Sequence, residues 1–182
     1  MLVWELNSLS RQVRCRRVLA ARGGVVAMSH EQRMTDAGIN LPEGYPPAGL
    51  YVGAVRVGNH LHIGGHGPVR NDGSMVTGKV GAGVDLQAAQ DAARLTGLQM
   101  LYTVREELGS LDAVDRVVKV FGMVNCAPGF NNTPAVIDGC SQLFLEVFGD
   151  DGVHTRAAVG MAELPFDICV EVEALFLLRD EN

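Results

Sequence analysis

Two alternating stretches near the C-terminus constrain the fold of this chain more than any other feature. Residues 156–162 and 168–176 alternate between apolar side chains and small or charged ones, and residues 163–167, which include Pro165, separate them. Because successive side chains of a β-strand point to opposite faces, the alternation predicts two strands. The short connection favours direct pairing of these strands as a β-hairpin.

The expected hairpin has a core face and an opposite face. The core face of the second strand is apolar and consists of Ile168, Val170, Val172, Ala174 and Phe176. The matching side chains of the first strand are Ala157, Val159 and Met161. Because residues opposite each other in paired strands share a face, we expect Arg156 and Glu171 together on the other face, beside small residues. A cation and a carboxylate around a hollow would suit a small acidic substrate and a water molecule.

The composition is that of one globular domain. The chain has 182 residues, of which 47% are hydrophobic and 20% charged, enough to bury a core. A net charge of −6 argues against a nucleic-acid partner, since nucleic-acid-binding surfaces carry a basic excess. The four cysteines are scattered, which fits reduced thiols in a cytoplasmic protein. No apolar run reaches the roughly 20 residues that span a bilayer, so we expect no membrane partner.

The N-terminal segment differs from the rest of the chain. Residues 1–27 contain five arginines against the single acid Glu5, and Met28 and Met34 follow. A basic leader of this kind is typical of a targeting peptide, but it lacks the uninterrupted apolar stretch of a secretory signal. We expect residues 1–34 to be a disordered leader or an upstream start, and residues 35–182 to form a single domain.

Turn residues divide this domain into seven elements. Two short β-prone runs, residues 51–57 and 60–67, flank Gly58-Asn59 and predict a hairpin. Helical periodicity follows the potential N-cap Asp85 and ends at Gly109. A strand over residues 114–124, a helix over residues 133–148 and the two terminal strands complete the order β-β-α-β-α-β-β. This order predicts an α+β fold with one mixed sheet and two helices packed on one of its faces.

Several local motifs resemble the RidA (YjgF) family of enamine/imine deaminases, whose members are sometimes labelled endoribonuclease L-PSP. The run from Arg156 to Leu164-Pro165, followed by residues 170–173, is similar to the C-terminal signature of that family. Leu50-Tyr51-Val52 resembles its tyrosine motif, and residues 58–66 resemble its Gly-Asn to Ser-Gly-Gln motif. The resemblance covers roughly residues 45–178. The segment 125–130 and Phe148-Gly149 resemble a longer-chain subgroup.

The resemblance implies a chorismate-mutase-like fold, a homotrimer and a site in the cleft between subunits. It implies hydrolysis of reactive 2-imino or 2-enamino acids to 2-keto acids and ammonia. Arg156 would grip the substrate carboxylate, because a guanidinium binds a carboxylate through two parallel hydrogen bonds. Glu171 would hold and activate the attacking water. Tyr51 would close the pocket, and groups near Gly65 and Ala158 would bind the imine nitrogen and the carboxylate.

No metal or organic cofactor is expected, because an imine is already electrophilic and its hydrolysis needs positioning and proton transfer. Three positions depart from the family pattern: Gly64 replaces a serine, His66 replaces a glutamine and Ala158 replaces a cysteine. These departures put the substrate preference in question. We expect His66 to line the pocket as a polar group, although His60, His62 and His66 together could also suggest a metal site.

Plainer interpretations of the same residues stay open. Arg156 could be a surface arginine, Glu171 and Glu173 could be solvated positions of a half-exposed sheet, and Tyr51 could be a strand aromatic. A trimeric protein that binds keto acids without turnover is therefore an alternative to the deaminase. RNA cleavage is a weaker alternative, because the chain is acidic and has no basic stripe.

Overall fold

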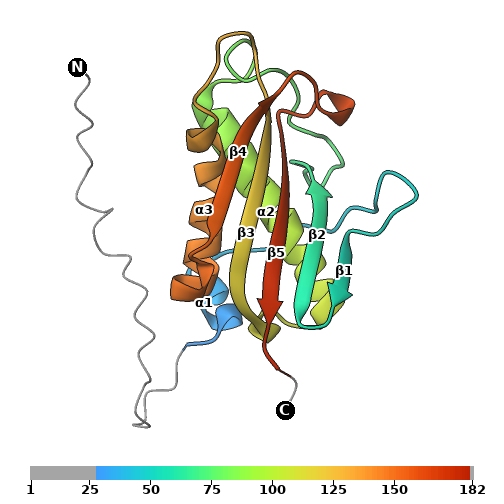
Figure 1. The fold of residues 1–182 in the computed structure, drawn as a ribbon, viewed down its shortest axis with the longest axis vertical. Coiled ribbons are helices and arrows are strands. Elements are labelled where there is room, and N and C mark those ends of the chain that lie inside the picture. The colour runs from blue at the N-terminus through green and yellow to red at the C-terminus, as the bar shows by residue number, and fades with distance from the viewer. Residues whose placement is uncertain (1–27, 181–182) are drawn as a thin grey trace, which may run out of the picture.

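The computed structural model describes residues 28–180, which form a five-stranded sheet with its helices packed against one face (Figure 1). The strands are β1 (Ala54–Val57), β2 (His60–His66), β3 (Val114–Asn125), β4 (Thr155–Met161) and β5 (Val170–Leu178). The helices are α1 (His30–Asp36), α2 (Leu86–Leu108) and α3 (Thr133–Phe148), and single 3₁₀ turns are η2 (Leu111–Ala113), η3 (Gly149–Gly152) and η4 (Pro165–Asp167).

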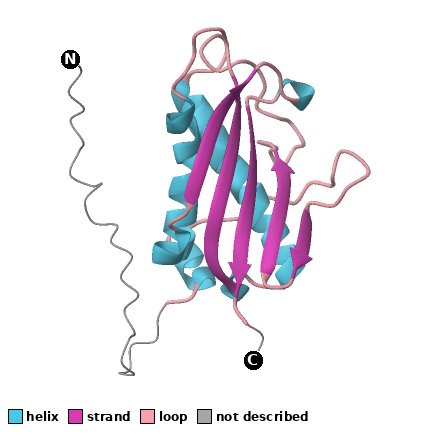
Figure 2. Ribbon diagram, viewed as in Figure 1, coloured by secondary structure: helices cyan, strands magenta, loops and turns pink. Residues whose placement is uncertain are grey.

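Helices α2 and α3 cover the same side of the sheet and leave the other side open (Figure 2). The α+β order predicted from the sequence is thereby confirmed, as is the hairpin of β1 and β2 around Gly58-Asn59. Within residues 28–180, no helix is both long and apolar enough to cross a membrane.

The ends of the long helix follow from local chemistry. The Asp85 carboxylate accepts a hydrogen bond from the Ala88 backbone N–H at 2.8 Å, which satisfies one of the unpaired donors at the start of α2. Gly109 ends the helix with a φ of 76°, a left-handed conformation that glycine adopts without steric cost. Both boundaries agree with the sequence prediction.

The pairing of the last two strands differs from the prediction. The strand order is β1-β2-β5-β3-β4, so β3 lies between β4 and β5. Strand β4 runs parallel to β3, and β5 runs antiparallel to it. The predicted terminal hairpin is therefore wrong. The reason is that β3, α3 and β4 form a crossover unit, which places β4 parallel beside β3. The connection through η4 then passes the end of β3.

The first described helix lies within the part of the chain that we expected to be a leader. In α1, His30 and Met34 are buried, and Met34 belongs to the main core. The Glu31 carboxylate accepts hydrogen bonds from the Arg105 guanidinium at 2.7 Å and from the Leu111 backbone N–H at 2.9 Å. The folded domain therefore includes residues before 35. The predicted leader over residues 1–27 lies outside the described residues.

The main core lies between the sheet and the helices. Its largest aromatic side chains are Phe144 and Phe148 on α3 and Phe176 on β5, all buried, with ring centroids 5.7–6.2 Å apart. Edge and tilted contacts of this kind add to the stabilisation that comes from burying the rings. The core fixes α3 against β3 and β5, and thereby fixes the face of the sheet on which each strand residue lies.

Candidate functional site

A cavity of about 450 Å³ lies where β2 ends and β5 begins. The C-terminal half of α2 forms one wall, and the loop that contains Tyr45 and Tyr51 forms another. The turn η4 contributes Phe166 to the rim. The volume falls within the range of small-molecule sites. Four residues that the sequence nominated line this cavity: Tyr51, Gly65, His66 and Glu171.

Glu171 is the half-buried carboxylate of the cavity. Within residues 28–180 it makes no hydrogen bond or ion pair. Burial, and secondarily the negative charge of Glu173, raise the pKa of the Glu171 carboxyl above its usual value. A carboxylate whose pKa is raised is a stronger base towards a bound water molecule than an exposed carboxylate is.

Gly65 makes the position of the Glu171 carboxylate possible. A Cβ atom at residue 65 would overlap the Oε1 atom of Glu171. At the neighbouring Gly64, the nearest atom to an added Cβ is the Gly53 carbonyl oxygen at 3.7 Å, an ordinary contact. A side chain at position 65 would therefore force the Glu171 carboxylate to shift from its position, whereas position 64 has room for a small side chain.

His66 is held by hydrogen bonds at both ring nitrogens. Its Nδ1 lies 2.8 Å from the Gly64 carbonyl oxygen, and its Nε2 lies 2.8 Å from the Thr103 hydroxyl. A carbonyl can only accept, so the proton of the neutral ring is assigned to Nδ1. Nε2 is then the acceptor, and it takes the Thr103 hydroxyl proton in preference to the Gln99 carbonyl oxygen, which lies farther away at 3.3 Å. Burial lowers the pKa of His66, and its bond to the Gly64 carbonyl offsets part of this effect. His66 therefore contributes a neutral ring in a fixed orientation to the cavity wall.

The rim residue Phe166 has a strained backbone. Phe166 and Asp167 adopt left-handed φ values of 56° and 57°. The buried Asn125 side chain holds this conformation, because its amide donates to the Asp167 carboxylate at 3.0 Å and to the Ile168 carbonyl at 3.2 Å. Left-handed backbone is costly for residues with side chains, and it persists where neighbouring contacts determine it.

Arg156 and Ala158, the other two nominated residues, lie on β4 and do not line the cavity. In register across the sheet, Arg156 is opposite the buried Val120, so its side chain is on the helix side, whereas Glu171 is opposite Met123. The prediction that Arg156 and Glu171 of one chain share a face is therefore wrong, because it assumed that β4 pairs with β5. Ala158 likewise packs against the core on the helix side.

The Arg156 guanidinium contacts helix α3. It donates to the Asp138 carboxylate at 2.8 Å, to the Ser141 hydroxyl at 2.9 Å and to the Pro134 carbonyl oxygen at 3.2 Å. Asp138 is largely exposed, so a competing carboxylate could reach the same nitrogen atoms. Arg156 thus lies at the free edge of strand β4, and the cavity lies beyond β5 on the other side of β3.

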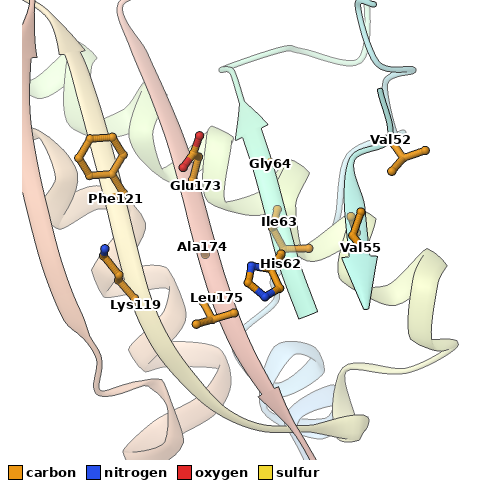
Figure 3. Close-up of a pocket in the computed structure, with 11 residues that line it drawn as sticks. Val52, Val55, His62, Ile63, Gly64, Lys119, Phe121, Glu173, Ala174 and Leu175 are labelled. Atoms are coloured by element: carbon orange, nitrogen blue, oxygen red, sulfur yellow. The ribbon is translucent and has the colours of Figure 1, made fainter. Parts of the chain in front are cut away.

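A second, shallower hollow of about 640 Å³ lies on the open face of the sheet (Figure 3). His62, Lys119, Phe121, Glu173 and Leu175 line it. In the described part of the chain, no three His, Cys, Asp or Glu side chains are arranged to hold a metal ion.

Sequence reasoning missed several walls of the cavity. Tyr45, Tyr102, Glu106 and Phe166 line it but were not nominated. Tyr102 and Glu106 are four residues apart on α2, the spacing that places two side chains on the same helix face. This spacing is a weak signal, because α2 carries other polar and charged side chains along its length.

A family model described as "YjgF/chorismate_mutase-like, putative endoribonuclease" matches residues 31–176. The chain belongs to the YjgF family. This membership confirms the resemblance and the chorismate-mutase-like fold that were inferred from the sequence motifs.

Individual proteins are also similar to this chain. Protein TCP17 of Trypanosoma cruzi is 43% identical over 144 residues, which are 79% of this chain and 90% of TCP17. A 2-iminobutanoate/2-iminopropanoate deaminase of Dermatophagoides farinae is 30% identical over 142 residues, 78% of this chain and 95% of the relative. An Agrobacterium tumefaciens protein with unknown function, whose crystal structure is known, is 39% identical in sequence. The two structures superpose with a TM-score of 0.73 over 82% of this chain and 91% of the Agrobacterium chain.

Proposed function

We propose that this YjgF-family chain hydrolyses reactive 2-imino and 2-enamino acids to 2-keto acids and ammonia. The observation that carries the proposal is Glu171, an unpaired carboxylate with a raised pKa on the wall of a ligand-sized cavity. The similarity to a relative named as a 2-iminobutanoate/2-iminopropanoate deaminase supports the same chemistry.

In the proposed reaction, Glu171 handles the proton of the attacking water. The carboxylate removes a proton as the water oxygen bonds to the carbon of the protonated imine, which gives a tetrahedral aminoalcohol. The same carboxyl then returns the proton to the amino group. As the carbon–nitrogen bond breaks and ammonia leaves, the Glu171 carboxylate takes the hydroxyl proton and releases it to solvent, which leaves a 2-keto acid. A carboxyl with a raised pKa suits these steps, and a positioned base of this kind typically contributes about 10²–10⁴ in rate.

The substrate carboxylate needs a cation that the cavity of one chain does not provide. We propose that Arg156 of a neighbouring copy supplies it in a homotrimer. Strand β4 lies at one edge of the sheet and β1 and β2 lie at the other, so head-to-tail contacts would bring one copy's Arg156 towards the next copy's cavity. The exposed apolar side chains Val55, Val57 and Val159 support burial of the sheet edges against other copies.

The test combines an ammonia-release assay with subunit mixing. Imines are generated in situ by an amino acid oxidase, and Glu171→Gln and Arg156→Ala are each expected to be inactive. When the two inactive variants are dissociated and reassembled together, about one quarter of the sites should combine an intact Glu171 with an intact Arg156 and regain activity. Full activity of Arg156→Ala alone, or no recovery on mixing, would contradict a shared site.

A binding protein without turnover is the second candidate. It is favoured by the three hydrogen bonds that tie Arg156 to α3, and by the departures at Gly64, His66 and Ala158. Calorimetric binding of 2-keto acids together with undetectable imine hydrolysis would support this candidate over the deaminase.

RNA cleavage has less support. The charged side chains on the described wall of the cavity are Glu106 and Glu171, with neither lysine nor arginine among them. A phosphodiester would be repelled by two carboxylates. Retention of RNA cleavage by a purified Glu171→Gln variant would show that any such activity does not belong to this cavity.

A further inference from the structure

The tyrosine side chains of this chain gather around the cavity. The sequence has three tyrosines, and all three, Tyr45, Tyr51 and Tyr102, line it together with Phe166. Tyr45, Tyr51 and Phe166 are 53%, 54% and 66% exposed, so a ligand can reach them. The face of an aromatic ring attracts cations, and the attraction increases when water is excluded.

The charged side chains that line the same cavity are all negative. Glu171 lies beside Gly65 where β2 and β5 meet, and Glu106 lies on α2, one helical turn after Tyr102. Within residues 28–180, Glu106 makes no ion pair or hydrogen bond. Since His66 is neutral, the cavity of the single chain presents two carboxylates and no cation.

The position of Tyr102 relative to the loop makes this wall rigid. The Gly44 backbone packs directly on the Tyr102 ring, where a Cβ at residue 44 would overlap the ring. The loop that carries Tyr45 is thereby held against α2. The ring of Tyr102 and the carboxylate of Glu106 therefore lie on one fixed wall, four residues apart on the same helix face.

We propose that the cavity selects imino acids whose side chain carries a positive charge, such as the imine formed from arginine. This proposal rests on the proposed deaminase function and names its substrate class. The reacting carbon lies at Glu171, and the side-chain cation lies among the tyrosine rings with Glu106 as its counter-ion. The substrate carboxylate points towards the arginine of the neighbouring copy.

Arginine and citrulline provide a matched pair of substrates. Their side chains have nearly the same shape, but the guanidinium is charged and the urea group is neutral. With oxidase flux matched, we expect kcat/KM for the arginine imine to exceed that for the citrulline imine about tenfold, the size of one or two cation–aromatic and carboxylate contacts. In Glu106→Gln this ratio should fall to about three, because the carboxylate contact is lost while the tyrosine rings remain.

The matched control is Glu107→Gln, which removes the adjacent exposed carboxylate of α2 that does not line the cavity. It should keep the wild-type ratio, and the melting temperatures of both variants should stay close to that of the wild type. A wild-type ratio near one, or a ratio that Glu106→Gln leaves unchanged, would overturn the selectivity.

The same assay distinguishes failure of the proposed deaminase function from failure of the proposed charge selectivity. If neither imine is hydrolysed faster than in buffer, the proposed function fails. Calorimetric titration with L-arginine and L-citrulline then decides the charge selectivity by itself. Tighter binding of L-arginine that Glu106→Gln weakens would support the charge selectivity, and equal binding of the two amino acids by the wild type would contradict it.

Discussion

Glu171 lies half-buried beside Gly65 without a hydrogen-bond partner in the described chain, whereas Arg156 donates three hydrogen bonds to α3. The carboxylate lies on a cavity wall, and the guanidinium lies on the helix side at the edge strand β4. The comparison teaches that the proposed proton-transfer group and the proposed anion-binding group belong to two different surfaces of one chain. The proposed deaminase site therefore combines groups from two copies.

The largest effect is expected when the Glu171 carboxylate is removed. Glu171→Gln should lower kcat about 10³-fold, because a neutral amide cannot accept a proton from water. The measurement is keto-acid formation at saturating imine, with Glu107→Gln as the control. Unchanged kcat in Glu171→Gln would move the chemistry away from this cavity.

A second prediction tests the geometry around the carboxylate. Gly65→Ala should lower kcat about 10²-fold, because the new methyl group would displace the Glu171 carboxylate from its position. Gly64→Ala is the matched control, since its methyl group meets its first neighbour at 3.7 Å. Single-turnover kinetics of the two variants measure the difference. Equal effects at the two positions would show that contact with Gly65 does not position Glu171.

A third prediction concerns the arginine surface. Asp138→Asn removes the ion-pair partner of Arg156 and should lower KM about two- to threefold, because the guanidinium then competes less with its own chain for the substrate carboxylate. The free energy of unfolding should change by less than about 1 kcal/mol, since Asp138 is 61% exposed. A higher KM would instead show that Asp138 orients Arg156 for binding.

The smallest effect is expected from Glu173→Gln. The charge of Glu173 is the second cause of the raised pKa of Glu171, so its removal lowers that pKa while the effect of burial stays. The active form of Glu171 is the carboxylate, and the acidic limb of the kcat/KM profile should therefore move to lower pH by less than about one unit. A shift to higher pH would contradict the assignment of that limb to Glu171.

Much of the fold could be predicted because it depends on local chemistry. The cap at Asp85, the glycine at 109 and the turn at Gly58-Asn59 each act within a few residues. The order of elements follows from such signals, and the motifs around Arg156 and Glu171 pointed to the family that the comparisons confirmed.

The neighbours of each strand could not be predicted in the same way. Strand β4 has the same alternation whether it pairs with β5 or with β3, so the pattern does not decide which face Arg156 occupies. On this edge strand, Ala158 packs on the helix side while Val159 is exposed on the open side, the reverse of the expected assignment. Small residues can pack beneath a helix as well as larger ones do where the helix approaches closely. The cavity walls Tyr102 and Glu106 depend on loop packing, which the sequence pattern does not describe.

The clamp between Asn125 and Asp167 links the end of a core strand to the aromatic rim. Asn125 is fully buried, and its oxygen also accepts a hydrogen bond from Lys79. Changes that loosen the interior near Asn125 would therefore move the backbone at Phe166 and reshape the rim of the cavity. The packing of the interior and the shape of the cavity entrance therefore depend on the same buried side chain.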